Sequence, residues 1–175
     1  MRFQVWLLPV VLQVLMLGVV VPQLAGASPR PDRLATQHFF CHTGYQLNDC
    51  LAQIEVLKRV VARFPTETLG KWTWVLVRSQ DWKPLTKMLG LNADSPAFTC
   101  LETKTTFIEE ALVAKVSGRA HELIVRWHMG MAELLNTAIE HEMGHAICHS
   151  LDENKAKYVA EVLEQKRPLS CPVGS

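Results

Sequence analysis

The sequence predicts an α+β fold, in which a small antiparallel or mixed β-sheet packs with helices. Three observations lead to this prediction. Residues 48–65 carry apolar side chains at helical spacing. Residues 71–79 and 97–112 are rich in the β-branched and aromatic residues that strands favour. Three further helical patterns follow residue 117, so the elements run helix, strand, helix, strands, helices.

The first 27 residues are predicted to be a secretory signal peptide. They begin with the charged Arg2, continue through a largely apolar run, and end in Ala25-Gly26-Ala27, which is a small-residue cleavage pattern. The apolar run would also suit an uncleaved membrane anchor, but its prolines and the small residues favour cleavage after Ala27. We therefore expect a secreted or periplasmic protein that keeps no stable membrane anchor.

Cleavage would leave 148 of the 175 residues, which suits one small domain. Residues 28–45 start polar and proline-rich, so an extended leading segment is expected there, followed by a single domain at 46–175. The formal net charge is +1 and no basic run stands out, so nucleic-acid binding is not expected. No pattern in the sequence indicates an oligomeric state.

The first helix and strand have clear local signals. Asn48 or Asp49 can cap the helix predicted at 48–65, and Pro65 ends it. The run at 71–79 predicts a short buried strand, because β-branched and aromatic residues follow one another.

The next segments predict a short helix and then one or two strands. Ser79 can cap a helix at 79–91, and Gly90 can end it. Residues 97–112 are about two strand lengths long, and form either one bent strand or a hairpin that turns near Thr103-Lys104.

The last part of the chain is predicted to be helical. A short helix lies between glycines at 118–130, the strongest helical pattern follows at 131–149, and a final helix at 152–166 is stopped by Pro168.

Five cysteines follow the predicted cleavage site, at positions 41, 50, 100, 148 and 171. An exported chain meets an oxidising environment, so disulfides are expected. Cys41 and Cys50 bracket a turn-like stretch and are the predicted pair. Because the count is odd, at least one thiol stays unpaired or joins another chain.

The stretch His141-Glu142-Met143-Gly144-His145 fits the H-E-x-x-H pattern. On a helical wheel, Glu142 falls within the apolar stripe of this helix, and His141 and His145 lie together on its flank. A carboxylate turned toward the interior needs a partner. Two histidines one turn apart can bind one Zn²⁺, which would supply the positive charge. The alternative is a core-facing glutamate paired with a protonated histidine.

A third metal ligand is sought after the second histidine. His149 lies eight residues from His141, about 12 Å along a helix, which is too far for a shared ion. Glu153, at the start of the last helix, is the preferred third ligand. Asp152 is the alternative, or a partner that orients a histidine ring. A capping box from Ser150 to Glu153 is a competing role for Glu153.

These residues resemble those of the zincin metallopeptidases. The resemblance rests on H-E-x-G-H, a following acidic residue and spaced alanines in "HEMGHAICHSLDENKAKYVAEVL", and extends over roughly residues 97–165. It implies a minimal zincin-like fold for the domain at 46–175, and a strand at 105–112 that forms the lip of the cleft and pairs with extended peptide. It also implies ligand roles for His141 and His145, the role of general base for Glu142, and that of acidic third ligand for Glu153.

The predicted function is that of an exported zinc metallopeptidase acting on peptide or protein substrates. In this hypothesis Glu142 takes a proton from metal-activated water, which then attacks the peptide bond. Tyr158 or His128 would steady the developing oxyanion. The alternatives are a catalytically inert zinc-binding module and a disulfide-stapled secreted interaction domain without metal.

Overall fold

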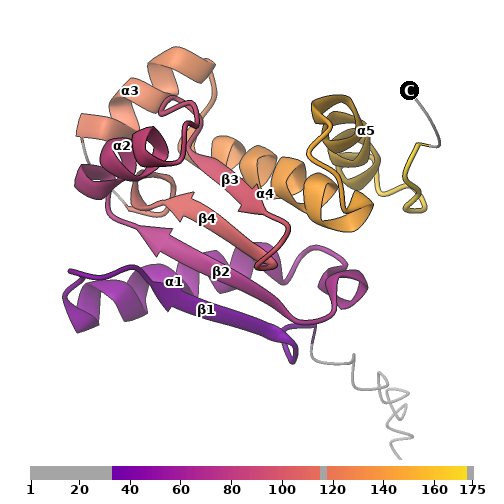
Figure 1. Ribbon diagram of the computed structural model, residues 1–175, viewed down its shortest axis with the longest axis horizontal. Helices are drawn as coiled ribbons and strands as arrows, with labels where there is room; N and C mark the ends of the chain where they lie inside the picture. Colours follow the sequence, from indigo (N-terminus) through magenta and orange to yellow (C-terminus); the bar gives the residue numbers. More distant parts are fainter. Residues whose placement is uncertain (1–32, 115–117, 173–175) are drawn as a thin grey trace, which may run out of the picture. The chain divides into compact units, whose positions relative to one another are not determined.

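The computed structural model describes residues 33–114 and 118–172, which form an α+β domain as predicted (Figure 1). The signal peptide and its cleavage site lie outside these residues. The strands are β1 (Gln37–Cys41), β2 (Trp72–Val77), β3 (Ala97–Cys100) and β4 (Thr105–Glu109). The helices are α1 (Leu47–Val61), α2 (Ser79–Met88), α3 (Gly118–Trp127), α4 (Met131–Cys148) and α5 (Glu153–Glu164), with short 3-10 turns η1 (Thr66–Leu69) and η2 (Glu110–Leu112).

The sheet is mixed, with the strand order β1-β2-β4-β3. β1 and β4 each run parallel to β2, whereas β3 runs antiparallel to β4. Two structures were predicted for residues 97–112, one bent strand or a hairpin, and the hairpin is the observed one. Its turn includes Lys104, which has a positive φ of 51°.

β1 was not predicted, because its residues were assigned to the extended leading segment at 28–45. Gln37 explains how this short strand is held. Its side-chain amide donates to the Gly70 carbonyl at 2.9 Å, and its amide oxygen accepts from the Trp74 indole at 3.0 Å. Phe39 stacks on Trp74 as well. The packed domain therefore begins before residue 46.

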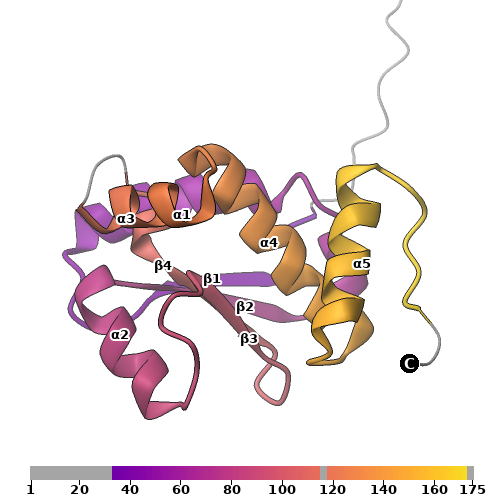
Figure 2. The ribbon, with the colours of Figure 1, turned by 90° about the horizontal axis from the view of Figure 1, so that it is seen from above.

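Helices α1, α3 and α4 lie over one face of the sheet, and α2 lies on the other side (Figure 2). The covered face carries the apolar positions of β2, since Trp72, Trp74 and Leu76 alternate with less buried neighbours. On the other side, Trp82 of α2 packs against Phe98 of β3, with ring centroids 5.5 Å apart. The covered face of the sheet thus supports α4, while α2 packs on the opposite face.

The predicted helix caps differ from the observed ones. α1 begins one residue earlier than predicted, so that Gln46 is its N-cap and Asn48 and Asp49 lie in its first turn. α2 is preceded by Arg78, and Ser79 is already helical. Gly90 does follow the end of α2 with a φ of 68°, as the sequence predicted.

Two disulfides are present in the described part of the chain. Cys41–Cys50 joins β1 to α1 and confirms the predicted pair, and Cys148–Cys171 ties the end of α4 to the C-terminal segment. Cys100 is the remaining free thiol and is half-buried. Two disulfides fit an oxidising, extracellular environment. Within residues 33–114 and 118–172, no helix is long and apolar enough to cross a membrane.

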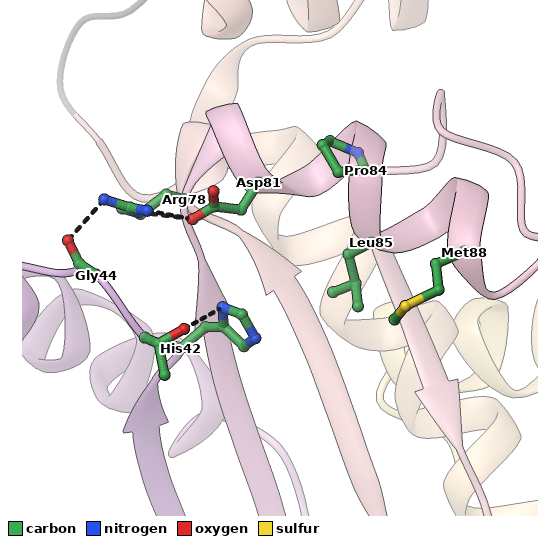
Figure 3. Close-up of a pocket in the computed structure, with 8 residues that line it drawn as sticks. His42, Gly44, Arg78, Asp81, Pro84, Leu85 and Met88 are labelled. Carbon is green, nitrogen blue, oxygen red and sulfur yellow. Dashed lines mark hydrogen bonds and ion pairs between the residues drawn. The ribbon is translucent and has the colours of Figure 1, made fainter.

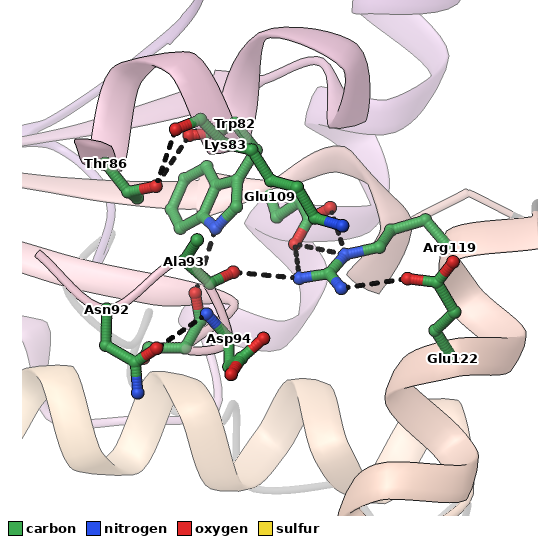
Figure 4. A network of polar contacts seen from close by, with 10 residues as sticks. Trp82, Lys83, Thr86, Asn92, Ala93, Asp94, Glu109, Arg119 and Glu122 are labelled. Atoms are coloured by element: carbon green, nitrogen blue, oxygen red, sulfur yellow. Dashed lines mark hydrogen bonds and ion pairs between the residues drawn. The ribbon is translucent and has the colours of Figure 1, made fainter. Parts of the chain in front are cut away.

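A buried ion pair fixes the loop that leads into β3 (Figure 4). Glu109, at the end of β4, is 0% exposed, and the Arg119 guanidinium donates to both of its carboxylate oxygens at 2.9–3.3 Å. Burial raises the pKa of Glu109, although Arg119 opposes this shift. Arg119 also donates to the Ala93 carbonyl at 3.0 Å, while the Trp82 indole donates to the Ser95 carbonyl at 2.9 Å.

Replacing Arg119 with methionine should strongly destabilise the fold, because Glu109 would be left buried without a cation. We expect the free energy of unfolding to fall by about 3–5 kcal/mol, measured by urea denaturation. Arg126→Met is the matched control, since Arg126 pairs with Asp94 at the surface and its loss should cost less than about 1 kcal/mol. Equal losses for the two variants would contradict this account of the network.

Candidate metal centre

The candidate site is built on the core-facing side of α4. Glu142 and His145 are 4% and 5% exposed, and His141 is half-buried. The helical wheel had placed Glu142 within the apolar stripe, and the structure shows it on the buried face of the helix. This arrangement brings a carboxylate and two imidazoles to one side of α4, next to β3.

The chain reverses sharply where α4 ends. His149 adopts a left-handed conformation with φ and ψ both at 46°, and the Ser150 amide donates to the His145 carbonyl at 3.1 Å. His149 is exposed and lies outside the group of residues able to hold a metal, as the distance argument predicted. The reversal brings the start of α5 back beside His145.

Gly144 allows α4 and α5 to pack closely. A Cβ atom at this position would lie 2.5 Å from the Ala156 carbonyl oxygen and 2.6 Å from the Ala156 Cα. Both atoms belong to the backbone, so neither can rotate away. Glycine is therefore required by the close approach of the two helices. Gly144 was predicted only as part of the H-E-x-x-H motif, although a glycine inside a strong helical pattern can indicate tight packing.

His141, His145 and Glu153 form a group that can hold a metal ion. The distance from His141 Nε2 to Glu153 Oε2 is 3.0 Å, and that from His145 Nε2 to Glu153 Oε1 is 3.6 Å. The candidate ligand atoms of all three residues lie within 4.8 Å of one another. Ligands about 2.1 Å from a tetrahedral ion would be about 3.4 Å apart, so small side-chain adjustments suffice.

Asp152, rather than Ser150, is the N-cap of α5. Its carboxylate accepts from the backbone amides of Asn154 at 2.8 Å and Lys155 at 3.3 Å. The capping box from Ser150 to Glu153, which was the competing role for Glu153, is therefore not formed, because the helix starts later than that motif requires. Glu153 is left free to face the histidines, whereas Asp152, the alternative ligand, is not a member of the metal-binding group.

A backbone carbonyl sets the tautomer of His145. His145 Nδ1 lies 2.9 Å from the Ser150 carbonyl oxygen, which can only accept a hydrogen bond. Nδ1 therefore donates to this carbonyl, and Nε2, which faces Glu153, is the ring nitrogen that can bind a metal ion. Burial, followed by the charge of His145, lowers the pKa of His141, which favours the neutral ring that binds metals.

A chain of hydrogen bonds runs through the sheet toward Glu142. The Trp72 indole donates to the Thr106 hydroxyl at 3.0 Å, and the Thr106 and Thr99 hydroxyls are 2.9 Å apart. Since the indole can only donate, Thr106 can donate in turn to Thr99, whose hydroxyl lies near Glu142 and opposes the rise of its pKa. The sequence contains no local signal for this chain of contacts, because it spans three elements.

Glu142 has one oxygen that this chain of hydrogen bonds does not satisfy. Its Oε2 atom is buried and has no hydrogen-bond partner among the described residues. Burial, reinforced by the charge of Glu153, raises the pKa of Glu142 to about 7. An unpaired buried carboxylate oxygen beside a three-ligand group can accept a hydrogen bond from a bound ligand.

The group opens into a cleft of about 720 Å³ between α4, α5 and the start of β3. Its wall on the sheet side is Ser95–Ala97, at the edge strand β3. The expectation that residues 105–112 form this lip is wrong, because β4 lies inside the sheet between β2 and β3. Neither Tyr158 nor His128, the predicted oxyanion donors, lines the cleft, whereas Lys157 does.

Another hollow lies beside α2, far from these ligands in the sequence (Figure 3). Arg78 dominates it, donating to the Gly44 carbonyl at 2.7 Å and pairing with Asp81 at 2.7 Å. The charges of Arg78 and Asp81 in this hollow therefore offset each other. The only group of three potential metal ligands found in the described residues is the one on α4 and α5.

Comparison with known proteins found no counterpart: no family model, curated protein or solved structure matches the chain. The class of site is defined by its own residues. It is a potential metal centre with two imidazoles and one carboxylate, next to a buried acid and open to a cleft.

Gly144→Ala should weaken metal binding, because the added methyl group would push α5, and Glu153 with it, away from the histidines. We expect the affinity for Co²⁺, used as a visible probe ion, to fall about 10- to 100-fold in a competition titration. Gly130→Ala is the control, since a Cβ there would meet nothing within 4 Å. Unchanged affinity in Gly144→Ala would refute the role of this helix crossing.

Thr99→Val should destabilise the protein, because it removes the buried partner of the Thr106 hydroxyl and a polar group that favours the charged form of Glu142. The expected loss in the free energy of unfolding is about 1–3 kcal/mol by chemical denaturation. Thr73→Val, on the neighbouring strand β2, is the control and should change stability by about 0.5 kcal/mol or less, since the Thr73 side chain makes no hydrogen bond to other described residues. Similar losses in both variants would show that Thr99 does not support Glu142.

Proposed function

We propose that this protein is an exported zinc metallopeptidase, in which His141, His145 and Glu153 bind Zn²⁺ and Glu142 is the general base. The observation that carries the proposal is the unpartnered, buried Oε2 atom of Glu142 beside the three ligands. If Glu142 had a structural role alone, its unpartnered buried oxygen would lower the stability of the fold with nothing to offset the cost.

The choice of zinc follows from the ligand types. Two imidazole nitrogens and one carboxylate oxygen form a typical catalytic zinc set, with one coordination position left open. A structural site would be closed by a fourth protein ligand. In the described part of the chain, the group has three members, and His149 faces solvent at the left-handed turn.

The residues around the ion would have separate tasks in peptide hydrolysis. Zinc, when bound, supplies Lewis acidity and lowers the pKa of water to about 7. Glu142 would accept a proton and pass it to the leaving amine, and a pKa raised to about 7 suits both transfers. Thr99 would hold the Glu142 carboxylate in position, and the Ser150 carbonyl would hold the His145 ring.

Lys157 is a better candidate than Tyr158 for stabilising the oxyanion. It lies one helical turn after Glu153, on the face of α5 that lines the cleft, and its charge contributes to lowering the pKa of His141. An ammonium group near the reacting carbonyl would stabilise developing negative charge. It forms no ion pair with another described residue.

The edge strand β3 is a suitable place for the substrate backbone. Its outer edge is unpaired within the described residues, and its first residue lines the cleft together with His141. An extended peptide can add to such an edge as a further strand. We propose that β3 takes the role that the resemblance assigned to residues 105–112. Export would follow from cleavage after Ala27, with release to the periplasm or the medium.

Metal analysis and a cleavage assay test this function. Protein purified without chelators should contain about one Zn²⁺ per chain and cleave casein, and a chelator should abolish cleavage until zinc is restored. Glu142→Gln should keep its zinc and lose about 10²- to 10⁴-fold in kcat/KM. Glu122→Gln is the matched control, because Glu122 also follows a histidine on a helix but is exposed and outside the cleft.

Two outcomes would overturn this proposal in different ways. One equivalent of zinc without cleavage of casein or peptides would indicate an inert metal-binding module. No bound zinc in zinc-replete buffer would indicate an interaction domain in which Glu153 simply pairs with a protonated His141, since their side chains are already 3.0 Å apart.

A further inference from the structure

The cleft beside the metal ligands carries an excess of negative charge. Apart from Glu142 and Glu153, four glutamates line it, at positions 133, 140, 161 and 164, and Lys157 is the only Lys or Arg among the described lining residues. The whole chain, by contrast, has a formal net charge of +1. Negative charge is therefore concentrated at the place where a substrate would lie.

The surroundings of these four carboxylates differ. None of them forms an ion pair within 4.0 Å in the described part of the chain. Glu140 and Glu164 also line an adjoining groove that contains four cationic side chains, those of Arg33, Arg63, Lys166 and Arg167. Glu133 and Glu161 line the cleft but not the adjoining groove. Their charge therefore acts mainly on a ligand in the cleft.

Glu133 and Glu161 lie at similar distances from the metal ligands. Glu133 precedes His141 by eight residues on α4, and Glu161 follows Glu153 by eight residues on α5. Eight helical residues span about 12 Å. Since an extended peptide rises about 3.4 Å per residue, a side chain that reaches these acids would come from two to four residues away from the bond at the metal.

Apolar surface accompanies the acids. Trp127 is 43% exposed and lines the cleft together with Met129, Leu134 and Ala138. Lysine and arginine have apolar stems that pack on such surface while their charged ends reach a carboxylate. An exposed indole can also bind a cation over its ring. The mixture of apolar and acidic lining therefore matches a long cationic side chain better than a purely apolar or a small polar one.

A separate observation marks the same cleft as a place for a ligand. Glu142 lines it, is 4% exposed, and has a carboxylate oxygen without a partner in the described residues. This atom lies at the reacting end of the cleft, and the four glutamates extend from it along α4 and α5.

We infer that the cleft selects peptides with a lysine or arginine two to four residues from the bond that is cleaved, and that Glu133 and Glu161 are the residues that determine this specificity. The inference rests on the proposed peptidase function, whose substrate it defines. The negative potential of the cleft would also raise the association rate of cationic peptides at low ionic strength.

A binding experiment with the zinc-loaded Glu142→Gln variant tests the inference without turnover. The probes are blocked, fluorescein-labelled alanine nonapeptides with a central phenylalanine, in which one lysine or one norleucine occupies each position in turn. Norleucine keeps the stem of lysine and removes the charge. Fluorescence anisotropy should show about tenfold tighter binding of the best lysine peptide than of its norleucine counterpart, and about 0.5 M NaCl should reduce this ratio.

Added substitutions identify the responsible residues. Glu133→Gln with Glu161→Gln should reduce the preference for lysine to about threefold or less, as one or two charge interactions are lost. Glu67→Gln with Glu102→Gln makes the same change in net charge at exposed positions outside the cleft, and should leave the preference intact. Mass spectrometry of the peptides cut by the wild-type protein then locates the lysine relative to the bond.

The outcomes separate this inference from the proposed function. If the wild-type protein cleaves both the lysine and the norleucine peptides, and the Glu142→Gln variant binds them with equal affinity, the inference is overturned but the proposed peptidase function is not. Tight binding of the lysine peptides without cleavage by the wild-type protein would overturn the peptidase but support a cleft that binds cationic peptides. Absence of binding to any peptide by the folded, zinc-loaded protein would overturn the inference outright.

Discussion

The close crossing of α4 and α5 at Gly144 is the contact on which the candidate site depends. At this point the backbone of Ala156 occupies the space that any larger residue at 144 would fill. Because the helices meet so closely, Glu153 at the start of α5 comes within 3.0 Å of His141. The reversal at His149 and the cap formed by Asp152 then fix where α5 begins. Steric fit between two backbones, rather than attraction between the ligands, thus sets the spacing of the three ligand atoms.

Burial of polar groups is the second constraint, and the fold treats its two buried acids differently. Glu109 is fully paired with Arg119, and this pair holds the loop that leads into β3. Glu142 has the Thr99 hydroxyl near it and a buried oxygen without a hydrogen-bond partner among the described residues. A fully satisfied acid stabilises a structure, whereas a half-satisfied one is an energetic cost that a ligand can offset. The contrast separates a structural carboxylate from a candidate functional one within the same domain.

The two ends of α5 are restrained by different means. At its start, the hydrogen bonds of Asp152 and the His145–Ser150 contact hold the turn. Beyond its end, the Cys148–Cys171 disulfide closes a loop that contains the whole helix. Cross-linking a loop of this length restricts the unfolded chain by about 3 kcal/mol in the chain-entropy model. The helix that carries Glu153, the candidate third ligand, is therefore secured covalently, which suits a small domain in an oxidising environment.

Local patterns in the sequence were enough for the class of fold, the five helices, the Cys41–Cys50 bridge and the buried position of Glu142, because helical periodicity and short spacings act over a few residues. They also limited the third ligand to Asp152 or Glu153. The tertiary structure brings Glu153, and not Asp152, into the group with the two histidines, because this depends on where α5 begins. It also decided that Gln37–Cys41 is a strand, that β3 rather than β4 forms the edge, and that Thr99 reaches Glu142. Each of these depends on contacts between segments far apart in the chain, whose geometry no local pattern encodes.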